Sequence, residues 1–343
     1  MGRVPHLDAT IQQLLRDGGV PGLSIATIRH GEVAQIIAAG TRNTSTGAPV
    51  EARTIFDAAS LSKPMFAYAV LQLIDAGALS LDTPLAERVP DYVSNDPRAT
   101  DVTVRHVLSH TTGLPNWRSK DLPLKTYFPP GDRFNYSGEG FVWLQRVVEA
   151  ISGKPVDAVM QDLVFDPFEM SDSGYVWRPQ FDTNYADPHD ATLVAGTKFK
   201  PTAANTASSL QTTASDYARF VQTVLSGARL KPATKRLWLE PQMRVRWHRS
   251  QCLAPAVPES DQRVAWSLGW GLEPDHGTFF HWGDNGRFKS FAIGSAVHRS
   301  AAVVFANGEN GMSIMSELID RLMPGEHPVF KWLDYTRYVA NER

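Results

Sequence analysis

Cysteine is almost absent from this chain of 343 residues, in which Cys252 is the only one. A single cysteine excludes an internal disulfide and a metal site built from several thiolates. Long apolar runs are also missing, and the first nine residues lack the apolar core of a signal peptide. We therefore expect a cytoplasmic protein without a membrane partner.

An excess of charge of either sign is missing as well. The chain has 34 Lys and Arg against 36 Asp and Glu, a formal net charge of −2, and no long block of like charge. We therefore expect no nucleic-acid partner, because such binding usually needs a basic surface. The hydrophobic fraction of 43% and charged fraction of 20% are ordinary for a soluble globular protein, and the length allows one large domain or two.

A metal site is not indicated either. His106 and His110 stand four residues apart, a spacing that can place two ligands on one helix face. No third acidic or histidine ligand follows nearby, and residues 111–115 end the helix at once. Motif matches without such context are mostly false, so we expect no metal and no other cofactor.

The stretch Ser60-x-x-Lys63 opens a segment, residues 64–77, that is apolar on nearly every side. A helix of that kind belongs in the middle of a core. Residues three apart share a helix face, so the Lys63 amine can reach the Ser60 hydroxyl and take its proton once burial lowers the lysine pKa. Taken alone, the pattern should occur by chance about once in a chain this long, and a serine that only caps the helix is then the more common explanation.

Helical spacing of apolar residues predicts further helices over residues 7–17, 140–151 and 215–225, the last with Ser215 as its cap. Between residues 226 and 264 the pattern is irregular. Strand patterns gather at the two ends of the chain. They cover residues 22–29 and 32–39, which form a hairpin, and residues 266–272, 278–282, 288–297 and 301–306, before a final helix over residues 313–323.

Strands at both ends with helices between them imply an α/β (α+β) chain whose sheet is assembled from the two termini. We expect a discontinuous sheet domain from residues 1–65 and 211–343. A mainly helical domain, residues 66–210, would be inserted on one side, with the active site at the interface. No internal repeat or low-complexity linker is present.

Three short motifs carry reactive or small residues and follow one another along the chain: Ser60-x-x-Lys63, Tyr136-Ser137-Gly138 and His281-Trp282-Gly283. In type and order they resemble the active-site motifs of the serine β-lactamase and penicillin-binding-protein superfamily. The class C β-lactamase branch, with its family VIII carboxylesterases, is the most similar. The flanking segments LSHTTGLP at residues 108–115 and SLGWG at residues 267–271 also resemble that branch. This agreement outweighs the capping explanation for Ser60.

The resemblance implies a β-lactamase/transpeptidase-like fold and a set of roles. Ser60 would be the acylated nucleophile, and Lys63 would share the proton transfer. Tyr136, its phenol pKa lowered by the lysine charge, would be the general base. The backbone N–H groups of Ser60 and Asp284 would form the oxyanion hole, and Gly283 would leave the backbone open to the substrate.

Two positions depart from the family pattern, although we still expect both to line the substrate site with Trp282. His281 stands where β-lactamases usually carry lysine, and histidine is mostly uncharged at neutral pH. Gly138 stands where an asparagine usually holds the substrate amide, and glycine has no side chain to donate a hydrogen bond. Arg287 is a candidate substitute cation.

These departures weaken the recognition of β-lactams and peptides more than they weaken acyl transfer. We therefore expect a serine hydrolase that acts as a carboxylesterase on short-chain or aryl esters, with β-lactamase activity as a weak side reaction. The alternatives are a β-lactamase, a D-amino-acid-specific peptidase or acyltransferase, and a non-catalytic relative that binds a ligand. An α/β-hydrolase is disfavoured because no Gly-x-Ser-x-Gly elbow is present. The expected partner is a small-molecule ester or amide, and nothing in the sequence indicates an oligomeric state.

Overall fold

The computed structural model describes residues 5–254 and 259–335. Residues 1–4, 255–258 and 336–343 lie outside the described residues. Residues 1–4 belong to the N-terminal segment considered as a signal peptide, and all three ranges belong to the expected sheet domain. Within the described ranges, no helix combines the length and apolar character needed to cross a bilayer.

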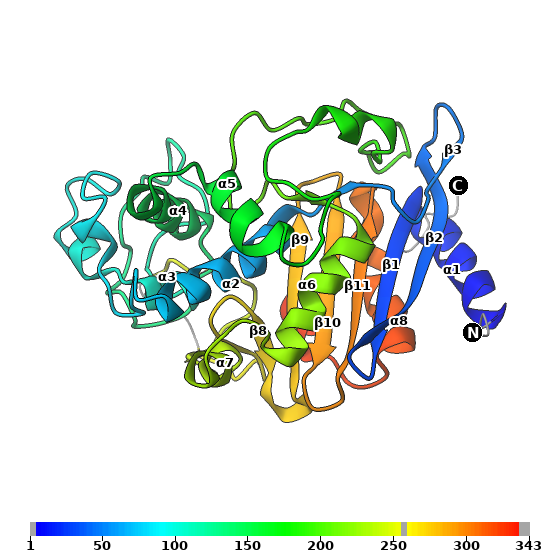
Figure 1. The fold of residues 1–343 in the computed structure, drawn as a ribbon. Coiled ribbons are helices and arrows are strands. Elements are labelled where there is room, and N and C mark those ends of the chain that lie inside the picture. Colours follow the sequence, from blue (N-terminus) through cyan, green and yellow to red (C-terminus); the bar gives the residue numbers. More distant parts are fainter. Residues whose placement is uncertain (1–4, 255–258, 336–343) are drawn as a thin grey trace.

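A nine-stranded sheet forms the centre of the molecule, in the order β3-β2-β1-β11-β10-β9-β8-β7-β6. Every neighbouring pair is antiparallel, and β1 from the start of the chain pairs with β11 from its end, which confirms a sheet built from both termini (Figure 1). Its strands are β1 (Gly22–Arg29), β2 (Glu32–Asn43), β3 (Ala48–Pro49), β6 (Met243–Arg244), β7 (Ala265–Trp266), β8 (Gly271–Glu273), β9 (Thr278–Asp284), β10 (Lys289–Ser295) and β11 (Ser300–Ala306). Two further strands, β4 (Phe56–Asp57) and β5 (Gln211–Thr212), pair with each other.

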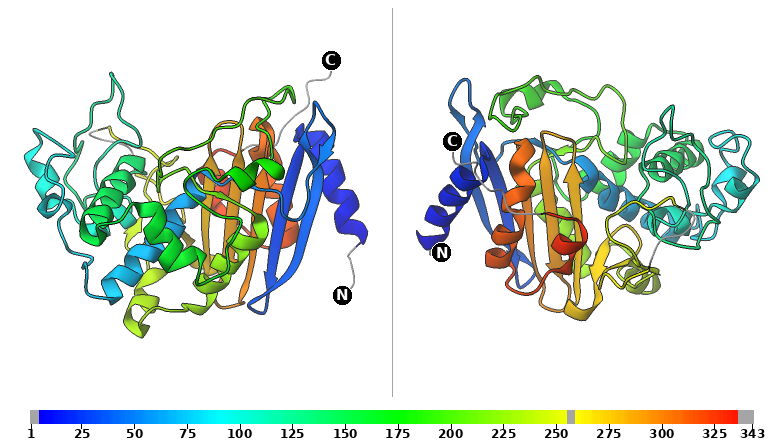
Figure 2. Two further views of the ribbon diagram at one scale, coloured as in Figure 1. Left: turned by 45° about the horizontal axis from the view of Figure 1, so that its top comes forward. Right: turned by 180° about the vertical axis from the view of Figure 1, so that it is seen from behind.

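Helices cover both faces of this sheet, as the front and back views show (Figures 1 and 2). Successive residues of β11 alternate between two apolar cores, Val303 and Phe305 in one and Ala302 and Val304 in the other, as the pleat requires. The first core contains residues of α2 (Ser62–Asp75) and α6 (Ala214–Ser226). The second contains residues of α1 (Pro5–Gly18), α8 (Met315–Leu322) and α9 (Pro328–Trp332).

The remaining helices lie mainly beside the β8–β9 side of the sheet (Figure 1). They are α3 (Val104–Leu108), α4 (Gly138–Ser152), α5 (Val156–Met160) and α7 (Pro232–Trp238). Since α2 to α5 all fall between residues 62 and 160, the middle of the chain contributes helices, as expected. The division into two domains at residues 66 and 210 stays a prediction.

The single strand expected over residues 266–272 is wrong. The segment instead turns back on itself, and β7 and β8 pair antiparallel with Ala265 opposite Leu272. Gly269 permits the reversal because its φ of +97° lies in the left-handed region. A Cβ there would come within 2.5 Å of Ala67 Cβ, so this turn packs closely on α2.

Two local expectations between residues 213 and 264 are also wrong. The cap of α6 is Thr213, whose hydroxyl accepts a hydrogen bond from the Asp216 N–H at 3.1 Å, while Ser215 lies inside the helix. Helix α7 interrupts the region expected to be irregular, and it begins with Pro232 in its first turn, where a missing N–H costs nothing.

Candidate active site

Ser60 stands where a short 3₁₀ turn, η1 (Ala59–Leu61), runs into helix α2. Both neighbours of Ser60 are buried, whereas Ser60 itself is partly exposed and can be reached from solvent. Ala59 adopts φ +50°, an uncommon conformation for a residue with a Cβ, and it aims the following serine away from the core. The helix N-terminus places partial positive charge beside the hydroxyl oxygen, which favours developing negative charge there.

A buried carboxylate holds this strained turn in place. Asp57 accepts a hydrogen bond from the Ala59 N–H at 2.8 Å. The Asn285 amide donates to both Asp57 oxygens at 3.1 Å, which ties the turn after β9 to the nucleophile. Burial raises the pKa of Asp57 to about 6, and the hydrogen bonds act in the opposite direction. Sequence reasoning missed both side chains because neither belongs to one of the three motifs.

The amine of Lys63 lies beside the nucleophile. Its Nζ is 3.0 Å from Ser60 Oγ and 2.7 Å from the Ala207 carbonyl oxygen, so the predicted contact between Ser60 and Lys63 is confirmed. Lys63 is fully buried, and burial lowers its pKa well below the usual range for lysine. A neutral amine can donate to the Ala207 oxygen and still accept the proton of Ser60.

Tyr136 lies against the same amine, with Lys63 Nζ 4.7 Å from the centre of its ring. The Tyr136 hydroxyl is buried and has no hydrogen-bond partner among the described residues. Burial raises the pKa of Tyr136, and the nearby Ser60 hydroxyl acts in the opposite direction. The prediction that lysine charge lowers this pKa is therefore wrong, because the effect of burial is larger than any that lowers it.

His110, which the sequence reasoning considered only as a metal ligand, packs against Tyr136 with ring centres 4.3 Å apart. Its Nδ1 accepts a hydrogen bond from the Ser137 N–H at 3.0 Å, whereas His106 Nδ1 accepts from the Thr103 N–H. The two histidines thus serve separate backbone groups. No cluster of three potential metal-binding side chains occurs within residues 5–254 and 259–335.

His281 and Trp282 complete the buried wall around Tyr136, whose ring centre is 4.9 Å from that of Trp282. His281 Nδ1 donates to the Trp282 carbonyl oxygen at 2.7 Å. Burial is the largest cause that lowers the pKa of His281, to about 3, so the ring is neutral at physiological pH. Arg287, the candidate substitute cation, instead lies 3.8 Å from the carboxylate of Asp190.

Gly283 allows β9 to pass directly beside the turn that precedes Ser60. A Cβ at Gly283 would collide with Ser290 Oγ and would lie 2.5 Å from the Ala58 carbonyl oxygen. The Ser290 hydroxyl donates to that same oxygen at 2.8 Å. Close packing against the nucleophile turn therefore requires glycine here, in addition to any need to admit the substrate.

The backbone of Asp284 is oriented as an oxyanion-hole donor would be. The Asn285 N–H donates to the Phe288 carbonyl oxygen, so Asn285 and Phe288 form a hydrogen-bonded pair. Along an antiparallel ladder, hydrogen-bonded pairs alternate with non-hydrogen-bonded pairs. The facing pair of Asp284 and Lys289 is then non-hydrogen-bonded, so the Asp284 N–H points away from β10. On that side β8 pairs with β9 only as far as Phe280 in the described chain, which leaves this edge open toward η1. The oxyanion role itself stays a prediction.

Gly138, the other departure, begins helix α4 and is buried against the indole of Trp117. No motif or spacing in the sequence pointed to Trp117.

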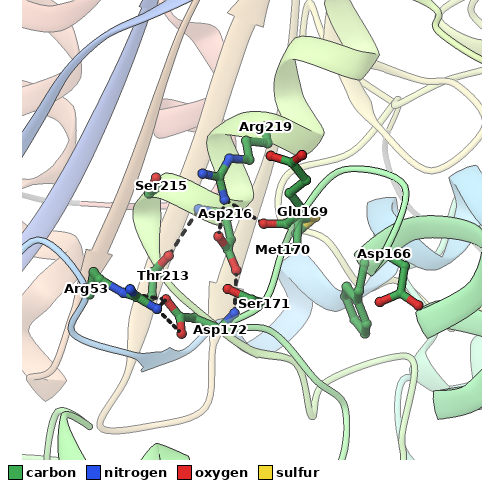
Figure 3. A pocket seen from close by; sticks show the side chains of 11 residues that line it. Arg53, Asp166, Glu169, Met170, Ser171, Asp172, Thr213, Ser215, Asp216 and Arg219 are labelled. Atoms are coloured by element: carbon green, nitrogen blue, oxygen red, sulfur yellow. Dashed lines mark hydrogen bonds and ion pairs between the residues drawn. The ribbon is translucent and has the colours of Figure 1, made fainter.

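A separate hollow of about 450 Å³ lies outside this site and includes none of its residues (Figure 3). Two ion pairs lie in its wall, Arg53 with Asp172 at 2.7 Å and Arg219 with Asp216 at 2.8 Å. Its other charged residues are Asp166 and Glu169, so acidic side chains outnumber basic ones in the lining.

Comparison with known proteins identifies relatives of the superfamily that the three motifs resemble. The Beta-lactamase family model matches residues 7–322. Esterase EstB from Burkholderia gladioli is 32% identical over 204 residues, which is 50% of this chain and 51% of that protein. Penicillin-binding protein 4 from Amycolatopsis lactamdurans is 26% identical over 345 residues, which is 93% of this chain and 89% of that protein.

A solved structure shares the whole fold. EstCE1, described as a hydrolase with promiscuous acyltransferase activity, superposes with a TM-score of 0.77 at 20% identity and covers 94% of this chain and 98% of its own. At that identity the likeness shows the fold alone. The family model spans most of the sequence, and the predicted superfamily is thereby confirmed: this chain belongs to the beta-lactamase family.

Proposed function

We propose that this chain, a serine hydrolase of the beta-lactamase family, cleaves carboxylic esters through an acyl-enzyme on Ser60. One observation carries the proposal: the fully buried amine of Lys63 lies 3.0 Å from the partly exposed Ser60 hydroxyl. A buried amine that is neutral at physiological pH is a competent base for a serine within hydrogen-bond distance.

The proposed reaction proceeds in two halves. Ser60 Oγ attacks the ester carbonyl carbon while its proton passes to Lys63 Nζ, and the N–H groups of Ser60 and Asp284 stabilise the oxyanion. The carbon–oxygen bond to the alcohol then breaks, and the leaving alcohol oxygen takes up the proton held on Lys63 Nζ. Water attacks the acyl-enzyme in the same way and releases the acid. Tyr136, which keeps its proton, donates a hydrogen bond to the alcohol oxygen as it leaves.

We propose esters as substrates, in preference to β-lactams and peptides, because of the two residues His281 and Gly138 on the side of the site that would recognise the substrate. His281 is neutral, so it offers no permanent cation to a β-lactam carboxylate. Gly138 offers no amide to a peptide-like side chain. The name of the EstB relative supports the same choice, whereas the name of penicillin-binding protein 4 supports the alternative of β-lactam binding or hydrolysis.

A fluorophosphonate probe tests the chemistry, because it reacts with activated serines irrespective of the natural substrate. We expect mass spectrometry to locate one adduct on Ser60. Ser60→Ala should lose the adduct and lower ester hydrolysis by about 10⁴-fold or more. Ser226→Ala, which changes an exposed serine at the end of α6, is the matched control. An unlabelled Ser60 in folded wild-type protein would support the non-catalytic alternative.

The substrate class is tested by comparing p-nitrophenyl butyrate with nitrocefin on the same preparation. We expect the ester to have the higher kcat/KM. Equal or faster turnover of nitrocefin would contradict the ester proposal and favour a β-lactamase, while leaving the role of Ser60 intact.

A further inference from the structure

The start of helix α4 faces the buried lysine. Phe141 is three residues after Gly138, so the two positions lie on the same face of the helix. The ring of Phe141 is 5.8 Å from Lys63 Nζ. A side chain at position 138 would therefore project on the side of α4 that faces Lys63.

That space is filled from another part of the chain. A Cβ at Gly138 would lie 2.6 Å from Cη2, 2.7 Å from Cζ2 and 3.0 Å from Cζ3 of Trp117. The far edge of the indole thus rests directly on the glycine backbone. Part of Trp117 still faces solvent, since 42% of the residue remains exposed.

The residues on either side of Trp117 are clamped onto the N-terminus of α4. Asn116 accepts the Gly138 N–H through its side-chain oxygen at 2.9 Å. Arg118 forms a two-pronged pair with the buried carboxylate of Glu139, at 2.9 and 2.7 Å, and the Tyr92 hydroxyl donates to the same carboxylate at 2.6 Å. An exposed tryptophan held from both sides is a preformed surface, because little conformational freedom is left to lose when a ligand binds.

We propose that the Trp117 indole is the specificity-determining surface of this site and packs against an apolar or aromatic group of the ester. The proposal rests on the ester hydrolysis proposed above and names the substrate class more closely. Glycine at position 138 removes a hydrogen-bonding side chain and admits an aromatic face in its place. The site then favours esters with a flat or branched apolar substituent over substrates that present a polar amide at this point.

The apolar group that packs on Trp117 belongs to either the acyl part or the alcohol part of the ester. Two pairs of substrates distinguish these possibilities, because each pair varies only one of the two parts. The acyl pair is p-nitrophenyl acetate and p-nitrophenyl butyrate, which share an alcohol. The alcohol pair is ethyl acetate and phenyl acetate, which share an acyl group. In wild-type protein we expect a preference for the larger partner in at least one pair.

Trp117→Ala should reduce that preference about tenfold, mainly through a higher KM, and Trp117→Phe should recover most of it because an aromatic face is kept. Val297→Ala is the matched control, since Val297 is also an exposed apolar residue. It lies in the turn between β10 and β11, whereas Asp284 faces Lys289 at the other end of β10. This variant should leave both preferences unchanged.

The two proposals fail in different ways. If wild-type Ser60 takes no fluorophosphonate, the proposed function fails. If wild-type protein is labelled and hydrolyses esters but Trp117→Ala keeps both preferences, only the role of Trp117 is overturned.

A second measurement tests the packing itself. Gly138→Ala forces a Cβ against the indole, so it should lower the melting temperature in wild-type protein and do so much less in the Trp117→Ala background. Equal losses in the two backgrounds would contradict the contact on which the inference rests.

Discussion

The two sides of this active site differ in how closely they keep the family pattern. On the nucleophile side, Ser60 and Lys63 are in contact where the η1 turn runs into the buried start of α2, and hydrogen bonds to Asp57 hold the turn. On the recognition side, a neutral His281 and a Gly138 covered by Trp117 replace a cation and an amide. Under the proposed roles, the groups that break the ester bond keep the family pattern, whereas the surface proposed to select the substrate departs from it.

The largest expected effect after loss of Ser60 is on the nucleophile side. Lys63→Met should lower kcat/KM for p-nitrophenyl butyrate by about 10³-fold, because the serine loses the base that takes its proton. Methionine has a similar length and suits the buried position, so circular dichroism should show an intact fold. Activity within a few fold of wild type would remove Lys63 from the mechanism and break the contrast between the two sides.

Tyr136→Phe should have a smaller effect, a loss of about 10²-fold in kcat/KM, because the raised pKa of Tyr136 makes it a hydrogen-bond donor and not the ionised base. Kinetics of the purified variant at neutral pH measure this loss. A deficit larger than that of Lys63→Met would reverse the order of the two residues and return the role of base to Tyr136.

Gly283→Ala tests the contact that joins the two sides. The added methyl group meets Ser290 and the Ala58 oxygen, so we expect a loss of about 1–3 kcal/mol in the free energy of unfolding. Denaturant titration measures this loss. As a control, Gly286→Ala changes a glycine in the next turn that has open space around it, although its φ of +71° still makes alanine somewhat unfavourable. Equal losses in both variants would show that the close packing at Gly283 has no special cost.

Much of the nucleophile side could be predicted because its information is local. The spacing of Ser60 and Lys63 and the apolar helix after them are visible in a few adjacent residues. The contact between Trp117 and Gly138 is not, because it joins a loop to a helix start 21 residues later and depends on how both are folded. The pKa of Tyr136 was predicted in the wrong direction for a related reason: motif order brings Tyr136 near a lysine but says nothing of how deeply both are buried.

The central claim is that Lys63 is neutral in the folded protein and serves as the base. Burial lowers its pKa well below the usual range for lysine. On this claim the amine is unprotonated at neutral pH and regains its proton only as the pH falls through the lowered value. The rate of fluorophosphonate labelling of Ser60, measured against pH, tests this directly. We predict a rate that falls in acid and changes less than about threefold from pH 7 to pH 9. A rate that keeps rising tenfold per pH unit through this range would contradict the account, because it would place the ionisation of the base near that of an ordinary lysine or tyrosine.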